Sequence, residues 1–144
     1  MKQPFVKPTD AELDILQVLW SKENASVREV HNIIANTKNV GYTTTLKLMQ
    51  IMFEKGIVDR DASSKVHIYR PTINKEETLN SLLNRITQSL FAGSKVDLIK
   101  QALRDNHLNE EELNTIEQLI EEQKKTLHNG AVTNSSDNHS GIQM

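Results

Sequence analysis

Residues 41–56 read GYTTTLKLMQIMFEKG and place three consecutive threonines at the start of an apolar helical pattern. Thr is a weak helix former and a good N-cap, and a single cap residue would suffice. The polar side chains of this stretch gather on one face of the predicted helix: Tyr42 just before it, then Thr43, Thr44, Lys47 and Gln50. A Thr can offer its hydroxyl to a base edge and its methyl group to thymine, and the N–H groups of a helix start can bind a phosphate. We therefore predict that this face enters the major groove of double-stranded DNA.

Simpler roles remain open for the three threonines. Thr43 could be the N-cap of the helix, with Thr44 a tolerated neighbour. Thr45 lies on the apolar stripe, so we expect it to be a core residue. No acidic residue occurs in the stretch before Glu54, and this favours a DNA contact for the outward side chains.

The elements that must position this helix can be predicted from cap and period signals. Residues 9–12 and 26–29 are capping boxes, each followed by apolar residues at helical spacing. The stretch above is the third helix, and Gly56 ends it. The period then changes to 2, which predicts strands at residues 57–60 and 66–70, the second stopped by a proline. Three helices followed by a hairpin are typical of a winged helix-turn-helix.

The hairpin and the second helix supply further candidate contacts to DNA. They are Ser64, Lys65, His67 and Arg70 in the hairpin and Arg28 in the second helix. For His67 and Arg28 an ordinary solvent-exposed role is equally open. We assign Trp20 and Tyr69 to the core.

A second region begins near Asn74 and contains three short amphipathic helices, which are too small to bury their apolar stripes among themselves. The candidate dimerisation residues are Leu79, Leu82, Leu83, Ile86, Leu90, Ile99, Leu103, Leu113, Ile116 and Ile120. The predicted fold is thus mostly α with a small β-hairpin wing. We predict a DNA-binding domain over 1–73, a helical dimerisation domain over 74–128 and a polar disordered tail over 129–144.

Charge and composition narrow the class of protein. The net charge is −2, but residues 1–73 carry ten Lys or Arg against eight Asp or Glu, and residues 74–144 carry seven against eleven. The front half is therefore the one suited to a polyanion. There is no cysteine, and the five histidines lack ligand spacing, so we expect no metal and no cofactor. We see no nucleophile–base pair or phosphate loop, and expect no enzyme.

We also expect a cytoplasmic protein that is not embedded in a membrane. No apolar run approaches the roughly 20 residues that a membrane span needs, and no signal peptide is recognisable.

The chain resembles the penicillinase repressor family, which groups β-lactamase, methicillin-resistance and copper-responsive repressors. The resemblance rests on the runs PTDAELDILQVLW, SVREVH, GYTTTLKLMQIMFEKGIVDRD and VHIYRP, and extends over residues 4–125 with LLNRI, LFAGS and VDLIKQAL. It implies a homodimeric winged-helix repressor whose N-terminal domain binds an inverted repeat in promoter DNA. It also implies release by a membrane sensor with a zinc-protease domain, through cleavage in the dimerisation helices.

Three features depart from the family's pattern. The cysteine cluster of the copper-responsive members is missing. Gln101-Ala102 stands where the staphylococcal members have the Asn-Phe pair that is cut, and Ile51 stands where they have Arg. The competing hypothesis is a winged-helix module that contacts proteins instead of DNA. The basic residues Lys65 and Arg70 in the wing favour DNA.

Overall fold

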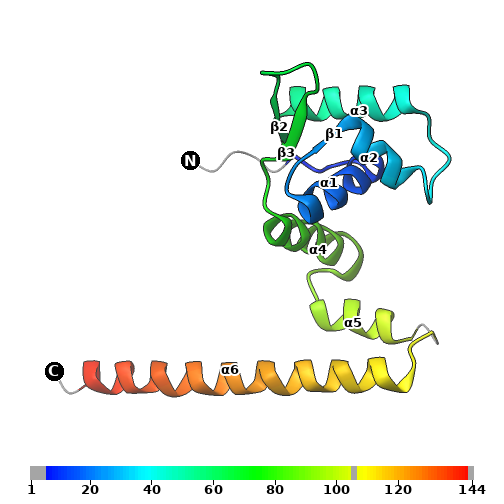
Figure 1. The fold of residues 1–144 in the computed structure, drawn as a ribbon. Coiled ribbons are helices and arrows are strands. Elements are labelled where there is room, and N and C mark those ends of the chain that lie inside the picture. Colours follow the sequence, from blue (N-terminus) through cyan, green and yellow to red (C-terminus); the bar gives the residue numbers. More distant parts are fainter. Residues whose placement is uncertain (1–5, 105–106, 143–144) are drawn as a thin grey trace. The chain divides into compact units, whose positions relative to one another are not determined.

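The computed structural model describes the backbone of residues 6–104 and 107–142, and side-chain surroundings up to residue 130. The chain forms two compact units, Met1–Gly93 and Ser94–Met144 (Figure 1). The first unit contains α1 (Asp10–Lys22), β1 (Ala25–Ser26), α2 (Val27–Ile34), α3 (Tyr42–Lys55), β2 (Val58–Asp61), β3 (Ile68–Pro71) and α4 (Lys75–Phe91). The second contains α5 (Lys95–Leu103) and α6 (Glu110–Ile142). The predicted class, mostly helical with a small β wing, is confirmed.

Both predicted capping boxes are formed at the starts of α1 and α2. Thr9 Oγ1 accepts a hydrogen bond from the Glu12 N–H at 3.2 Å, and Glu12 Oε1 accepts one from the Thr9 N–H at 2.9 Å. Ser26 and Glu29 make the same reciprocal pair, at 3.2 and 3.1 Å. These bonds satisfy N–H groups that a helix start otherwise leaves without an intrahelical acceptor.

The core of the first unit lies between α1, α2, α3 and the sheet. Its buried apolar residues are Ile15, Leu16, Leu19, Ala25, Val27, Val30, Ile34, Met49, Met52, Ile57, Val58 and Tyr69. Trp20 is half-buried against this cluster, and its indole N–H donates to the Ile73 carbonyl at 3.0 Å. Burial of each large apolar side chain contributes about 1.5–3 kcal/mol to the free energy of unfolding, so the packing of its apolar side chains holds α3 against the core. The core assignments of Trp20 and Tyr69 agree with this arrangement.

The sheet has one more strand than the sequence predicts. Its order is β1-β3-β2, all antiparallel, with Tyr69 paired to Ala25 on one side and to Arg60 on the other. The sequence predicts that the second hairpin strand stops before Pro71. In the structure Pro71 is itself the last residue of β3 and pairs with Val58. β1 pairs only with the first half of β3, so Pro71 has a neighbour on one side only, where a proline is tolerated.

Helix α4 starts and ends where the sequence predicts. Asn74 Oδ1 accepts from the Glu77 N–H at 3.1 Å. After Phe91, Ala92 and Gly93 both adopt positive φ, 49° and 85°, which breaks the helix. By its contacts α4 belongs to the first unit, although we predicted it as the first helix of the dimerisation domain. A helix can pack on its own unit and still offer its outer face to a partner.

The second unit has two capped helices. Ser94 Oγ accepts from the Asp97 N–H at 3.1 Å at the start of α5, and Asn109 and Glu112 form the predicted reciprocal cap of α6. The sequence predicts a disordered tail from residue 129, whereas α6 continues to Ile142. No proline interrupts that stretch, and an established helix gains one hydrogen bond with each added residue. Residues 143 and 144 lie outside the described part of the tail.

Most of the predicted dimerisation side chains are open to solvent in the single chain. Leu82 and Ile116 are half-buried, and eight others are exposed: Leu79, Leu83, Ile86, Leu90, Ile99, Leu103, Leu113 and Ile120. The most exposed is Leu90, at 73%. Exposed apolar side chains at helical spacing on successive helices are typical of an association surface.

Candidate nucleic-acid interface

Helix α3 presents the predicted polar face to solvent. Thr43, Thr44, Lys47 and Gln50 are exposed, and Tyr42 is 37% exposed. Thr45 is 1% exposed and faces inward beside Met49 and Met52, as predicted. The helix includes Tyr42 and takes Gly41 as its N-cap, so the alternative role of Thr43 as the cap is excluded.

A groove of about 390 Å³ lies between α3, the start of α2 and the hairpin. Its lining residues are Ser26, Val27, Arg28, Tyr42, Leu46, Gln50, Arg60, Lys65, Val66, His67 and Tyr69. The structure thus brings together five of the residues that the sequence singled out, from three separate elements: Arg28, Tyr42, Gln50, Lys65 and His67. Figure 1 shows the hairpin standing beside α3 in the first unit. Thr43, Thr44 and Lys47 are not among the lining residues.

Arg60 is a basic groove residue that sequence reasoning missed. It lies on β2, and its guanidinium carbon is 4.2 Å from the centre of the Phe53 ring on α3. A cation over an aromatic face is attracted by the ring, so the contact holds the long side chain in place. Strand periodicity could have identified Arg60. Alternate residues of a strand share one face, so Arg60 lies on the same face of β2 as the buried Val58, the face that packs against the rest of the unit.

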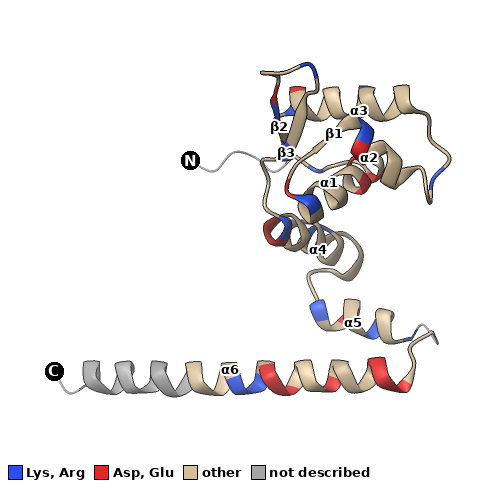
Figure 2. Ribbon diagram, in the orientation of Figure 1, with Lys and Arg blue, Asp and Glu red and all other residues tan. Residues whose placement is uncertain are grey.

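The lining residues of the groove carry basic groups and no carboxylate. They include Arg28, Arg60 and Lys65 together with His67, and neither Asp nor Glu is among them. The guanidinium of Arg28 sits 4.6 Å from the centre of the Tyr42 ring, which joins α2 to the start of α3. Figure 2 shows α3 bearing acidic colour only toward its C-terminal end. A concave surface of one charge concentrates a polyanion.

Two predicted hairpin contacts lie outside the groove lining and have partners of their own. Arg70 Nη2 is 3.0 Å from Asp59 Oδ2, and the hydrogen bond from Arg70 lowers the pKa of Asp59. Ser64 donates its hydroxyl to the Val66 carbonyl at 2.9 Å. The pKa of Asp61 is also lowered, because Ser63 donates hydrogen bonds to its carboxylate. The hairpin therefore carries two ionised carboxylates, one of which offsets the charge of Arg70.

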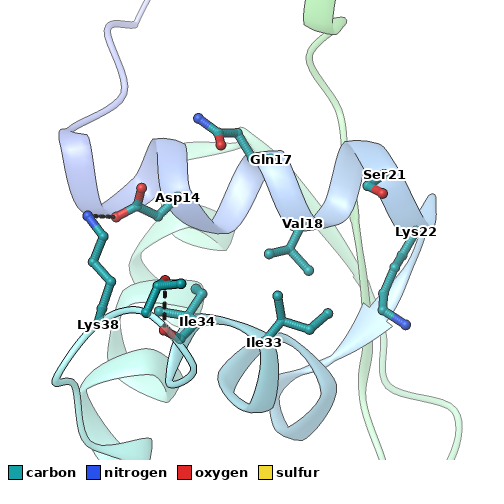
Figure 3. A pocket seen from close by; sticks show the side chains of 9 residues that line it. Asp14, Gln17, Val18, Ser21, Lys22, Ile33, Ile34 and Lys38 are labelled. Atoms are coloured by element: carbon teal, nitrogen blue, oxygen red, sulfur yellow. Dashed lines mark hydrogen bonds and ion pairs between the residues drawn. The ribbon is translucent and has the colours of Figure 1, made fainter.

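A second hollow, of about 360 Å³, lies between α1 and the C-terminal end of α2. Val18 and Ile33 point toward one another there, and Lys38 reaches across to Asp14 at 3.0 Å (Figure 3). Because that ion pair offsets a basic charge and aliphatic side chains line the middle, the hollow is less suited to phosphate than the groove beside α3. None of the predicted DNA contacts lines it.

Two other features are absent from the part of the chain that the structure describes. No group of three or more His, Asp and Glu side chains there could hold a metal ion. No described helix combines the length and the apolar character that crossing a membrane requires.

Comparison with known proteins gives the family of the chain. The family model described as "Penicillinase repressor" matches residues 8–122. The penicillinase repressor of Bacillus licheniformis is 22% identical over 116 residues, covering 81% of this chain and 91% of the relative. That of Staphylococcus aureus is 22% identical over 125 residues, covering 87% and 99%.

Among solved structures, the DNA-binding domain of the repressor BlaI matches with a TM-score of 0.47 at 21% identity, covering 53% of this chain and 93% of that domain. Because the family model spans most of the sequence, the chain belongs to the penicillinase repressor family, whose members are transcriptional repressors and not enzymes.

Proposed function

We propose that this repressor acts as a homodimer on an inverted repeat in promoter DNA. One observation carries the proposal. The exposed face of α3, which has polar side chains and a single lysine, lies beside a groove whose lining has basic side chains and no carboxylate. A helix of this kind fits the major groove, and the basic groove fits the phosphates beside it.

The side chains divide into two roles under this proposal. Thr43, Thr44 and Lys47, which are exposed on the outward face of α3, contact base edges, and so does Gln50, which is exposed at the border of the groove. Arg28, Arg60, Lys65 and His67 contact the sugar–phosphate backbone, because they line the adjoining groove. Phosphate contacts add affinity for any sequence through counterion release, and base contacts add the preference for one sequence.

Dimerisation would supply the spacing between the two half-sites. The apolar side chains of α4, α5 and α6 that are open in the single chain become buried against a second copy. Two DNA-binding domains on one dimer then bind with an avidity that neither has alone. A dimer that occupies a promoter excludes the polymerase. Since the proposed function requires contact with promoter DNA, we place the repressor in the cytoplasm.

We infer from the family that an upstream sensor, a membrane zinc protease, ends repression. Gln101 and Ala102, which stand in place of the pair cut in the staphylococcal members, are exposed on α5. They do not reproduce that pair, so we propose a cut within the dimerisation helices without assigning it to this position. Such a cut would separate the DNA-binding domain from the apolar side chains that follow it. The loss of avidity would then release the promoter.

In vitro selection from a random duplex pool, followed by gel shifts, tests the DNA-binding proposal. We expect the recovered duplexes to share an inverted repeat and to bind more tightly than a scrambled duplex. Affinity should fall steeply between 50 and 200 mM salt, with a log–log slope of about −0.9 per phosphate neutralised. Failure to enrich any sequence, together with salt-independent or absent binding, would instead favour a protein-contacting module.

A further inference from the structure

The start of α3 is held differently from the starts of the other helices in its unit. At α1, α2 and α4 the N-cap side chain, Thr9, Ser26 or Asn74, accepts a hydrogen bond from a backbone N–H of the first turn. At α3 the N-cap is Gly41, which offers no side chain for such a bond. The first turn of the helix that faces DNA in our proposal must therefore be fixed in another way.

Two residues of α2 contact two residues in the first turn of α3. His31 Nδ1 and Thr45 Oγ1 share a hydrogen bond of 3.0 Å. The His31 ring also meets the Tyr42 ring edge-on, with centres 5.6 Å apart and planes at 88°, and Arg28 lies over the same Tyr42 ring at 4.6 Å. Residues 28 and 31 are three apart on α2, and residues 42 and 45 are three apart on α3. Each pair therefore shares one helix face, and the contacts form a single interhelical cluster.

Burial makes His31 the central member of this cluster. Thr45 is 1% exposed, so its hydroxyl needs a partner within the protein, and His31, itself half-buried, provides one. A second contact of that hydroxyl, to the Gly41 carbonyl, is longer at 3.5 Å. His31 thus joins the buried side of the first turn, through Thr45, to its exposed side, through Tyr42.

We propose that His31 is a positioning residue for DNA recognition: it clamps the first turn of α3 laterally against α2, in place of a side-chain N-cap. This inference rests on the proposed function. A lateral clamp leaves the first-turn N–H groups uncovered by a capping side chain and leaves the hydroxyls of Thr43 and Thr44 on the outer face. Hydrogen bonds to base edges weaken steeply with misalignment, so base readout depends on the clamp more than non-specific attraction does.

The test compares affinity for two probes of equal length, the selected duplex and a scrambled duplex, by fluorescence anisotropy with the full chain. We expect His31→Ala to weaken binding of the selected duplex about fivefold to tenfold, the worth of one hydrogen bond, and to leave the scrambled duplex within about twofold. His31→Asn, whose amide can stand where Nδ1 stood, should restore most of the loss. Asn32→Ala, a neighbouring exposed change on α2, is the matched control and should bind both probes like the unaltered chain.

A double-mutant cycle with Thr45→Val identifies the contact through which His31 acts. If the clamp operates through the shared hydrogen bond, His31→Ala and Thr45→Val together should cost little more than either alone. Additive losses would overturn the proposal, and so would equal weakening of both probes with a lower melting temperature, or unchanged binding by His31→Ala. If the unaltered chain itself prefers no sequence, the proposed function fails, which is a separate result.

Discussion

At the scale of single residues, the candidate DNA-binding surface contains two kinds of basic side chain. Lys47 is exposed on the outward face of α3, whereas Lys65 lines the groove between α3 and the hairpin. Under the proposed function, Lys47 contacts a base edge and Lys65 contacts a phosphate. The two lysines should therefore differ in how their loss depends on DNA sequence.

Lys47→Ala should weaken binding of the selected duplex by about 1–3 kcal/mol and relax the preference at one base position. Lys65→Ala should weaken all duplexes alike and reduce the magnitude of the salt slope by about one. Anisotropy titrations at several salt concentrations measure both effects. Lys124→Ala, which removes an exposed charge on α6, is the control. Equal losses on selected and scrambled duplexes for both changes would remove the distinction between base and phosphate contacts.

A second residue-scale prediction concerns Glu12, which is 1% exposed and binds Lys55 at the end of α3 through two hydrogen bonds of 3.0 and 2.9 Å. Burial opposes its ionisation, but hydrogen bonds from Thr9 and Lys55 outweigh burial and lower its pKa below the ordinary 4.5. The unfolded chain thus binds this proton more readily. The stabilisation is present above pH 4.5 and is lost as the pH falls through the lower, folded value.

Glu12→Gln should therefore reduce the free energy of unfolding by about 1–3 kcal/mol at neutral pH, and by progressively less as the pH is lowered toward about 3. Urea denaturation across that range measures both. Asp14→Asn breaks the more exposed pair with Lys38 and should cost less than about 1 kcal/mol. If Glu12→Gln lowered the free energy of unfolding by the same amount at neutral and at acid pH, the lowered pKa of Glu12 would be contradicted.

At the scale of elements, cap signals predicted more of the fold than strand signals did. The paired residues 9 and 12, 26 and 29, and 109 and 112 each form reciprocal caps, because these bonds depend only on local sequence. The two-residue strand β1 was missed, because it has no period to detect and exists only through pairing with β3, more than 40 residues away.

The candidate site was predictable where local sequence carries it, on α3, at the start of α2 and in the hairpin. The exposed face of α3 follows from periodicity, and Gly41 as the cap was hidden by the threonines beside it. Arg60 and His31 were not identified, because their importance arises from tertiary contacts with Phe53 and Thr45. The continuation of α6 past residue 129 was not predicted, because the prediction relied on the polar composition of that stretch. Whether a helix continues depends also on the helical turn that precedes the stretch.

Two adjacent residues at the end of α4, Ala92 and Gly93, should respond to substitution with opposite changes in the free energy of unfolding. Ala92 holds φ at 49°, a left-handed conformation that suits glycine. Ala92→Gly should therefore raise the free energy of unfolding by about 0.5–1 kcal/mol, after allowing for the greater freedom of glycine in the unfolded chain. A decrease on urea denaturation would show that the strain is not there.

Gly93→Ala should lower stability by about 1–2 kcal/mol. Gly93 has φ of 85°, and an added Cβ would lie 3.3 Å from the Gln88 side-chain amide nitrogen. The same denaturation experiment measures it, and an unchanged midpoint would contradict the argument.

At the scale of the whole molecule, the proposal requires that the exposed apolar side chains of α4, α5 and α6 hold two chains together. Leu83 on α4 and Ile116 on α6 belong to that set. Leu83→Asp or Ile116→Asp should give monomers in analytical ultracentrifugation and abolish binding of the selected duplex, because a charge would have to be buried in the interface. Asn84→Asp, an exposed neighbour on α4, should remain dimeric. A dimer that survives both apolar changes would place the interface elsewhere.

Protection of guanine N7 from methylation on the selected duplex tests the central claim most directly, because N7 is reached through the major groove. The account predicts two protected patches on one face of the duplex, about 10 base pairs or a multiple of that apart, since each chain of a dimer inserts one α3. Bound duplex whose guanines stay fully reactive, or which shows one protected patch alone, would contradict it.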